Sequence, residues 1–117
     1  MGVVIVKSKL TKEDVNSARE EYDNFFKITI DVNQGIVAIG GEYHFDAEQI
    51  LVREYKSKNS NIWGGGYYID NKTYTSNAHL NYKPNLDNPS GEILNEKTRK
   101  KFLILAKKAL INIESLQ

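Results

Sequence analysis

The stretch "FFKITIDVNQGIVAIGG", residues 25–41, determines the fold class that we expect for this chain. In its first half, apolar side chains alternate with polar ones. Phe26, Ile28, Ile30 and Val32 fall on one face, and Lys27, Thr29 and Asp31 fall on the other. This period of two is typical of a strand with one buried face. "NQG" (33–35) supplies turn residues before a second apolar segment, "IVAIG" (36–40), so the stretch predicts an antiparallel hairpin.

Further strands are predicted on both sides of this hairpin. "VVIV" (3–6) is a short β-branched run of the kind that forms strands. "IWGGGYYI" (62–69) and "TYTSNAHLNY" (73–82) are joined by "DNK" and predict a second hairpin. The sheet should therefore contain about five strands, most of them antiparallel.

Three helices are predicted from capping residues and from apolar residues at helical spacing. Thr11 and Asp14 resemble a capping box that opens a helix of about 12 residues. Asp46 is the expected N-cap of a second helix that ends near Tyr55. Asn95 is the expected N-cap of a third helix, which covers residues 96 to about 114.

The resulting element order is β-α-β-β-α-β-β-α, with helices between hairpins rather than after every strand. This order favours an α+β fold with a mostly antiparallel sheet. We expect two layers, with the helices on one face of the sheet, and a single domain over residues 1–117. The opposite face of the sheet would then be polar or covered by a partner.

The composition excludes several classes of protein. Hydrophobic residues make up 40% of the chain and charged residues 26%, which is typical of a globular protein rather than a disordered one. The absence of cysteine excludes disulfides and thiolate metal sites. No apolar stretch has the length of a signal-peptide core or a membrane span, so we expect a cytoplasmic protein with no membrane partner. The net charge of +1 creates no global field that would attract nucleic acid.

One candidate metal site follows from residues at every second position of "GGEYHFDAEQ" (40–49). In an extended chain Glu42, His44 and Asp46 would project to one side, and His79 on the polar face of strand 73–82 could join them. These residue types are ligands for divalent zinc, manganese or iron. Alternatively, His44 or His79 could act as a general acid or base, with Glu42 as the carboxylate that orients the imidazole. The alternative is structural: Asp46 caps a helix, Gly40 and Gly41 mark a turn, and the other side chains are solvated.

A small-ligand site is the second candidate. The three glycines of "IWGGGYY" could form a floor for a planar ligand, walled by Trp63, Tyr67 or Tyr68. The polar row of strand 73–82, which includes Asn77 and Asn81, could orient a ligand from the side. The alternatives are a bend or a close packing contact at the glycines, and a solvated surface for the asparagines. We therefore expect the working surface where the 40–46 turn meets strand 73–82.

Two macromolecular partners are also considered. A homodimer could cover the open face of the sheet through an apolar patch at Trp63, Tyr67 and Tyr68. Nucleic acid could dock on a lysine stripe of the last helix, formed by Lys97, Lys101 and Lys108. That helix lacks interleaved exposed aromatic residues, which favours a solvated face instead.

Four segments together resemble a known family. They are "GGEYHFDAE", "IWGGGYY", "NYKPNLDNPS" and the "NEKTRKK" start of the last helix. As a set, they are similar to a family of short uncharacterised bacterial and archaeal proteins, a domain of unknown function, over about residues 3–112. The resemblance implies no activity, ligand or catalytic residue. The function therefore has to be argued from the site itself.

Overall fold

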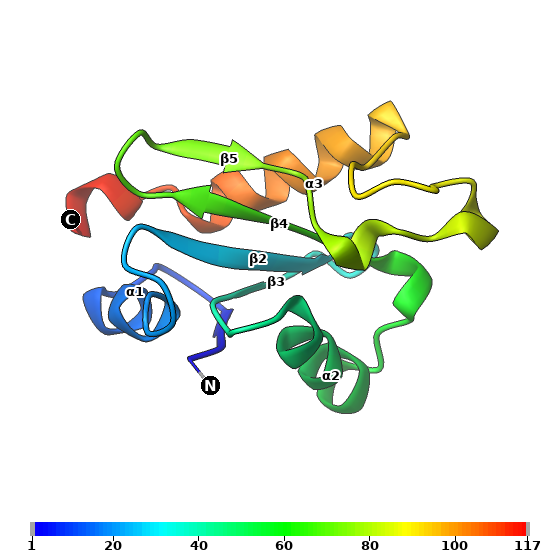
Figure 1. The fold of residues 1–117 in the computed structure, drawn as a ribbon. Coiled ribbons are helices and arrows are strands. Elements are labelled where there is room, and N and C mark those ends of the chain that lie inside the picture. Colours follow the sequence, from blue (N-terminus) through cyan, green and yellow to red (C-terminus); the bar gives the residue numbers. More distant parts are fainter. Residues whose placement is uncertain (1, 117) are drawn as a thin grey trace.

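The fold is built on a five-stranded sheet with the strand order β1-β3-β2-β4-β5, in which every neighbouring pair is antiparallel (Figure 1). The computed structural model describes residues 2–116. The strands are β1 (Val4–Val6), β2 (Phe25–Asp31), β3 (Ile36–Ile39), β4 (Ile62–Tyr68) and β5 (Thr73–Thr75). The helices are α1 (Lys12–Ala18), α2 (His44–Tyr55) and α3 (Glu96–Ala109), with short 3-10 turns at η1 (Asn59–Asn61), η2 (His79–Asn81), η3 (Pro84–Leu86) and η4 (Ile113–Leu116). The predicted α+β fold with an antiparallel sheet is confirmed.

The hairpin of β2 and β3 forms as its alternation predicts. Ile28 lies opposite Ile39, and Ile30 lies opposite Val37. The carboxylate of Asp31 accepts the backbone N–H groups of Asn33 and Gln34 at 2.9 and 3.0 Å, which closes the turn. Strand β2 also pairs with β4 along its full length, so it is the central strand of the sheet.

The main apolar core lies between one face of the sheet and helices α1 and α3. Phe26, Ile28 and Ile30 of β2 are fully buried there, against Phe102 of α3. Burying a side chain of this size contributes roughly 1.5–3 kcal/mol. The core also contains residues of β3, β4, α1 and α3 and of the chain next to these two helices: Leu10, Val15, Ala18, Val37, Ile39, Trp63, Tyr67, Ile93, Ala106, Leu110 and Ile113.

Helix α2 covers the opposite face of the sheet, which differs from the two layers predicted from the sequence. A Cβ atom placed on Gly65 would lie 2.9 Å from the ring of Phe102 on α3, whereas one placed on Gly64 would lie 2.8 Å from the ring of His44 on α2. Consecutive strand residues point to opposite faces, so the two helices lie on opposite sides. Ala47 and Leu51 of α2 are fully buried against the sheet. The two-layer prediction was wrong because α2 has few buried residues that could indicate a helix packed on the second face of the sheet, and because the polar face of β2 was expected to be free of helices.

Strand β5 is much shorter than the predicted strand 73–82, and a side chain replaces the missing part. The Oδ1 atom of Asn81 accepts the N–H of Gly64 at 2.8 Å, and its Nδ2 donates to the carbonyl of Gly64 at 2.9 Å. These are the two bonds that a neighbouring strand would make. The same Nδ2 lies 3.0 Å from the carbonyl oxygen of Ser76 and 2.9 Å from that of Gly91. Asn81 therefore fastens the long connection between β5 and α3 to the sheet.

A second buried asparagine completes this connection. The Nδ2 atom of Asn88 donates to the carbonyls of Asn81 at 2.8 Å and Glu92 at 2.7 Å, and its Oδ1 accepts the N–H of Leu94 at 2.8 Å. Buried amides of this kind hold irregular chain by replacing backbone pairs. Within residues 2–116, no helix combines the length and the apolar character that a membrane span requires.

Candidate ligand-binding site

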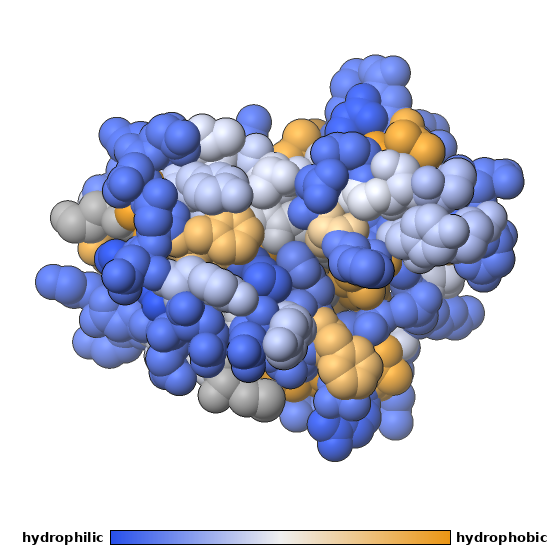
Figure 2. Space-filling view, viewed as in Figure 1, coloured by the Kyte–Doolittle hydropathy of each residue, from blue (hydrophilic) through white to orange (hydrophobic). Residues whose placement is uncertain are grey.

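A pocket of about 440 Å³ lies on the α2 side of the sheet. On the face of the molecule seen in Figure 2, hydrophobic side chains (orange) lie among hydrophilic ones (blue). We call the pocket the His44 pocket. Its wall combines one residue of β2, the first turns of α2 and the turn η2: Lys27, Tyr43, His44, Phe45, Glu48, His79 and Leu80. The volume falls within the range of small-molecule sites.

The imidazole of His44 is fixed by the backbone of β4. Its Nε2 atom lies 2.8 Å from the carbonyl oxygen of Gly65. A carbonyl oxygen only accepts hydrogen bonds, so Nε2 carries the proton and Nδ1 is left as an acceptor. Burial lowers the pKa of His44 to about 4; the bond to Gly65 opposes this shift, and the charge of Lys27 adds to it. His44 is therefore a neutral hydrogen-bond acceptor near pH 7.

The glycines of β4 make room for aromatic rings of the protein itself. A Cβ atom at Gly64 would collide with the imidazole of His44, one at Gly65 with the ring of Phe102, and one at Gly66 with the ring of Phe25. The run that could have been a floor for a planar ligand is thus occupied by side chains of this chain. The close-packing alternative is the one that the structure supports, and Gly64 is what lets His44 reach the sheet.

Lys27 supplies a positive charge to the His44 pocket. Its Nζ atom lies 4.5 Å from the ring centre of Tyr22 and 5.6 Å from that of Phe25. It is also 3.5 Å from the hydroxyl oxygen of Tyr22. Among residues 2–116, no carboxylate lies within ion-pair distance of this ammonium group. Its charge is positioned by aromatic rings and is not neutralised by a partner.

The structure brings together two of the four predicted metal ligands. His44 and His79 both line the pocket, but Glu42 and Asp46 do not. The extended chain that would have aligned them does not exist, because α2 begins at His44. Asp46 is therefore the third residue of the helix and not its N-cap, and its Oδ2 accepts the N–H of Tyr43 at 3.1 Å. Glu42 is exposed. Within the described part of the chain, no group of three or more His, Asp or Glu side chains is placed to hold a metal ion.

The four predicted ligand-binding residues lie elsewhere. Trp63 and Tyr67 are 7% and 2% exposed and belong to the core, because their alternation along β4 turns them toward α3. Asn81 is fully buried and bonded to backbone. Asn77 is exposed, and its Nδ2 donates to Glu92 at 2.7 Å. None of the four lines the His44 pocket.

Five residues of the pocket were missed by the sequence analysis: Lys27, Tyr43, Phe45, Glu48 and Leu80. Lys27 carried one usable signal, since it is the only lysine on the polar face of the central strand. Glu48 carried none. It accepts a hydrogen bond from the side chain of Asn59, whose Oδ1 in turn lies 3.4 Å from the Nζ of Lys83. Burial lowers the pKa of Lys83, and Glu48 opposes that shift.

The surface predicted for a homodimer is not formed. Of its three aromatic residues, Trp63 and Tyr67 are in the core and only Tyr68 is exposed, at 42%. The lysine stripe considered for nucleic acid, at Lys97, Lys101 and Lys108, is exposed on α3 as expected. An exposed stripe alone does not distinguish a binding face from a solvated one, so that hypothesis stays a prediction.

The sequence profile of one protein family, described as "Protein of unknown function (DUF5674)", matches residues 4–109. No curated protein matches the chain. No solved structure matches it either. The match covers most of the chain and confirms the resemblance to an uncharacterised family. The chain therefore belongs to the DUF5674 family of proteins of unknown function.

Proposed function

We propose that this protein binds a small organic acid with a planar or apolar body in the His44 pocket. The observation that supports this proposal best is the convergence of an unpaired ammonium group, a neutral imidazole and exposed aromatic rings on one concavity. Sites of this kind usually combine apolar walls with a few polar groups that fix orientation. The pocket has both.

Lys27 is the anchor for the acidic group. An ammonium ion without a carboxylate partner retains its full attraction for an anionic ligand, and its position between Tyr22 and Phe25 reduces the side-chain entropy that binding would cost. The carboxylate of Glu48 lies on the same wall and repels a second negative charge. The preferred ligand therefore carries one acidic group placed toward Lys27.

The remaining groups select the rest of the ligand. Tyr43 and Phe45 are 61% and 58% exposed, and they provide apolar surface at the rim. A ring that packs against them would remove both from water, which contributes about 25 cal/mol per Å² of apolar area. The neutral His44 can accept a hydrogen bond from an N–H or O–H group at its Nδ1. A proton-donating role is not favoured near pH 7, since its pKa is about 4.

The test is a titration with benzoate, phenyl phosphate and the neutral analogue benzamide, followed by NMR of the imidazole and backbone signals. We expect saturable shifts at His44, Phe45 and His79 with at least one of the two acids, and benzamide should bind at least fivefold more weakly. The variant Lys27→Met keeps the packing against Tyr22 and should weaken binding of the acid by about the same factor.

A matched control separates this effect from loss of net charge. Lys101 is exposed on α3, on the opposite side of the sheet, so Lys101→Met should leave the affinity within twofold. The proposal is refuted if neither acid produces saturable shifts at the pocket, or if both lysine variants weaken binding equally.

A further inference from the structure

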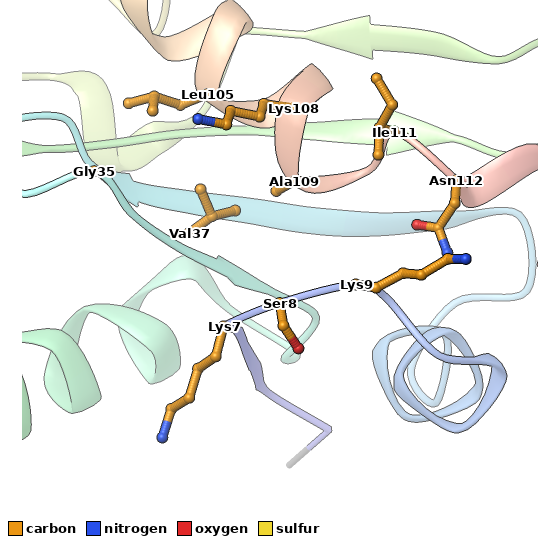
Figure 3. Close-up of a pocket in the computed structure, with 10 residues that line it drawn as sticks. All are labelled: Lys7, Ser8, Lys9, Gly35, Val37, Leu105, Lys108, Ala109, Ile111 and Asn112. Atoms are coloured by element: carbon orange, nitrogen blue, oxygen red, sulfur yellow. The ribbon is translucent and has the colours of Figure 1, made fainter.

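A second pocket lies on the α3 side of the molecule, at the edge of the sheet where β1 ends and β3 begins (Figure 3). Its volume is about 400 Å³, and it shares no lining residue with the His44 pocket. It lies between the chain that follows β1, the start of β3 and the last turns of α3. We call it the lysine pocket.

The floor of the lysine pocket is apolar. It is formed by Val37 of β3, by Leu105 and Ala109 of α3, and by Ile111 after the helix. Ile111 is 82% exposed, the most exposed of the large apolar residues in the described chain. Complete burial of such a side chain would contribute roughly 1.5–3 kcal/mol, and most of this free energy is not gained while Ile111 is exposed to water. A ligand that covers it would recover part of that free energy.

A buried acceptor without a partner lies in the wall of this pocket. Nδ2 of Asn112 donates to the carbonyl of Leu10 at 2.8 Å. Because that carbonyl can only accept, the amide cannot be turned round, and Oδ1 must face the other way. Oδ1 is buried and has no hydrogen-bond partner among the described residues. Figure 3 shows this oxygen turned toward the pocket. An unpaired buried acceptor costs about 1–3 kcal/mol, which a ligand N–H or O–H group would offset.

The rim of the pocket is positively charged. It carries Lys7, Lys9 and Lys108, and none of them has a carboxylate within ion-pair distance among residues 2–116. In Figure 3, Lys108 extends beside Leu105, Lys9 extends toward Asn112, and Lys7 extends away from the pocket. Lys9 and Lys108 are therefore the two cations placed to contact a ligand at opposite ends of the floor.

We propose that the lysine pocket binds a small acyl-type acid that carries a hydrogen-bond donor next to its acidic group, as in an N-acylated amino acid. The acyl chain covers Leu105 and Ile111, the carboxylate lies beside Lys9, and the N–H group donates to Oδ1 of Asn112. The acyl chain thus matches the apolar floor, the carboxylate matches the positive charge of Lys9, and the N–H group matches the unpaired Oδ1 of Asn112. The site is independent of the His44 pocket, and its failure would leave the proposed function untouched.

The experiment titrates the full chain with N-octanoylglycine and follows the methyl signals of Val37 and Leu105 by NMR. Decanoate, which has the acid and the chain but no N–H group, and the neutral amide of N-octanoylglycine are the comparison ligands. We expect saturable shifts with N-octanoylglycine, and affinities at least fivefold lower for both comparison ligands, because each lacks one counterpart.

Three variants test the assignment of residues. Combined Lys9→Gln and Lys108→Gln substitutions should weaken binding about tenfold, whereas Lys97→Gln, an exposed lysine of the same helix far from the pocket, should change it less than twofold. Ala109→Phe should fill the floor and abolish binding while the lysines remain. Unchanged signals from the His44 pocket show that each variant is folded.

The outcomes are decisive in both directions. The absence of saturable shifts at Val37 and Leu105 overturns the proposal, and so does binding that survives Ala109→Phe. Equal weakening by Lys97→Gln would reduce the effect to net charge and overturn it as well.

Discussion

Replacing Asn81 with alanine should destabilise the protein far more than replacing its exposed neighbour Asn77. The side chain of Asn81 is fully buried and reaches the N–H and carbonyl of Gly64 and the carbonyls of Ser76 and Gly91. The carbonyl of Gly91 also accepts the N–H of Ala78 at 2.9 Å and stays paired after the substitution. The two groups of Gly64 and the carbonyl of Ser76 lose the partner that Asn81 provides.

The magnitude follows from those groups. Each buried polar group left unpaired costs about 1–3 kcal/mol, and water entering the vacated space offsets part of that cost. We therefore expect Asn81→Ala to lower the free energy of unfolding by about 3–5 kcal/mol. Asn77 is exposed and makes one side-chain bond to Glu92, so Asn77→Ala should cost about 0.5 kcal/mol or less.

Urea unfolding followed by circular dichroism measures the difference. With a slope of about 1–3 kcal/mol per molar urea, Asn81→Ala should lower the unfolding midpoint by more than about 1 M, whereas Asn77→Ala should leave it nearly unchanged. A loss below about 1.5 kcal/mol for Asn81→Ala would show that this amide does not serve as a substitute strand, and the reasoning would fail.

Three further predictions concern His44 and the glycines of β4. The pKa of His44 is about 4 in the folded protein and 6.5 for the free side chain, so the unfolded state binds more protons between these values. The free energy of unfolding should therefore fall by about 2 kcal/mol as the pH drops from 7 to 5. Urea midpoints at both pH values measure this fall, and a His44→Asn variant should not show it. Gly64→Ala would place a Cβ atom 2.8 Å from the His44 ring, which should displace the imidazole into water and raise its pKa toward 6.5, seen as an NMR titration of His44 above pH 5; a pKa that stays near 4 would contradict the packing argument. Gly65→Ala places a Cβ atom 2.9 Å from the ring of Phe102 and against the backbone of Thr75, and overpacking of this kind should cost about 1–3 kcal/mol or more in a thermal melt, whereas Gly91→Ala, where the nearest atom is 3.4 Å away, should cost less.

The strands and helices whose signal is local were predictable from the sequence. The alternation of Phe26, Ile28 and Ile30 along β2 requires only that one face be buried, and the structure buries that face. The capping box of Thr11 and Asp14 forms with both bonds, at 3.0 and 3.1 Å. In each case, the residues that carry the signal are neighbours in the chain.

Features that depend on distant partners were predicted incompletely. Asn81 stands in a sequence that alternates like a strand, and nothing local shows that its amide pairs with Gly64, 17 residues earlier. The start of α2 at His44 was missed because Asp46 was read as an N-cap, although an acidic third residue of a helix fits the same pattern. The meeting of His44 and His79 in one pocket was predicted as a location, but Lys27, which gives the pocket its charge, lies on a strand that the sequence had not connected with them.

The side-chain amide of Asn81, which completes the edge of β4, also closes part of that edge to pairing with another copy of the chain. Beyond the three residues of β5, the outer hydrogen-bonding groups of Gly64 would otherwise be open to a strand from another chain. The segment "IWGGGYY" contains no charged residue, and an uncharged strand edge with unpaired N–H and C=O groups is a template on which another chain can pair. Asn81 occupies that edge with a side-chain amide, which does not continue as a strand, so the same residue that holds a loop in place also takes up groups at which a second chain would pair.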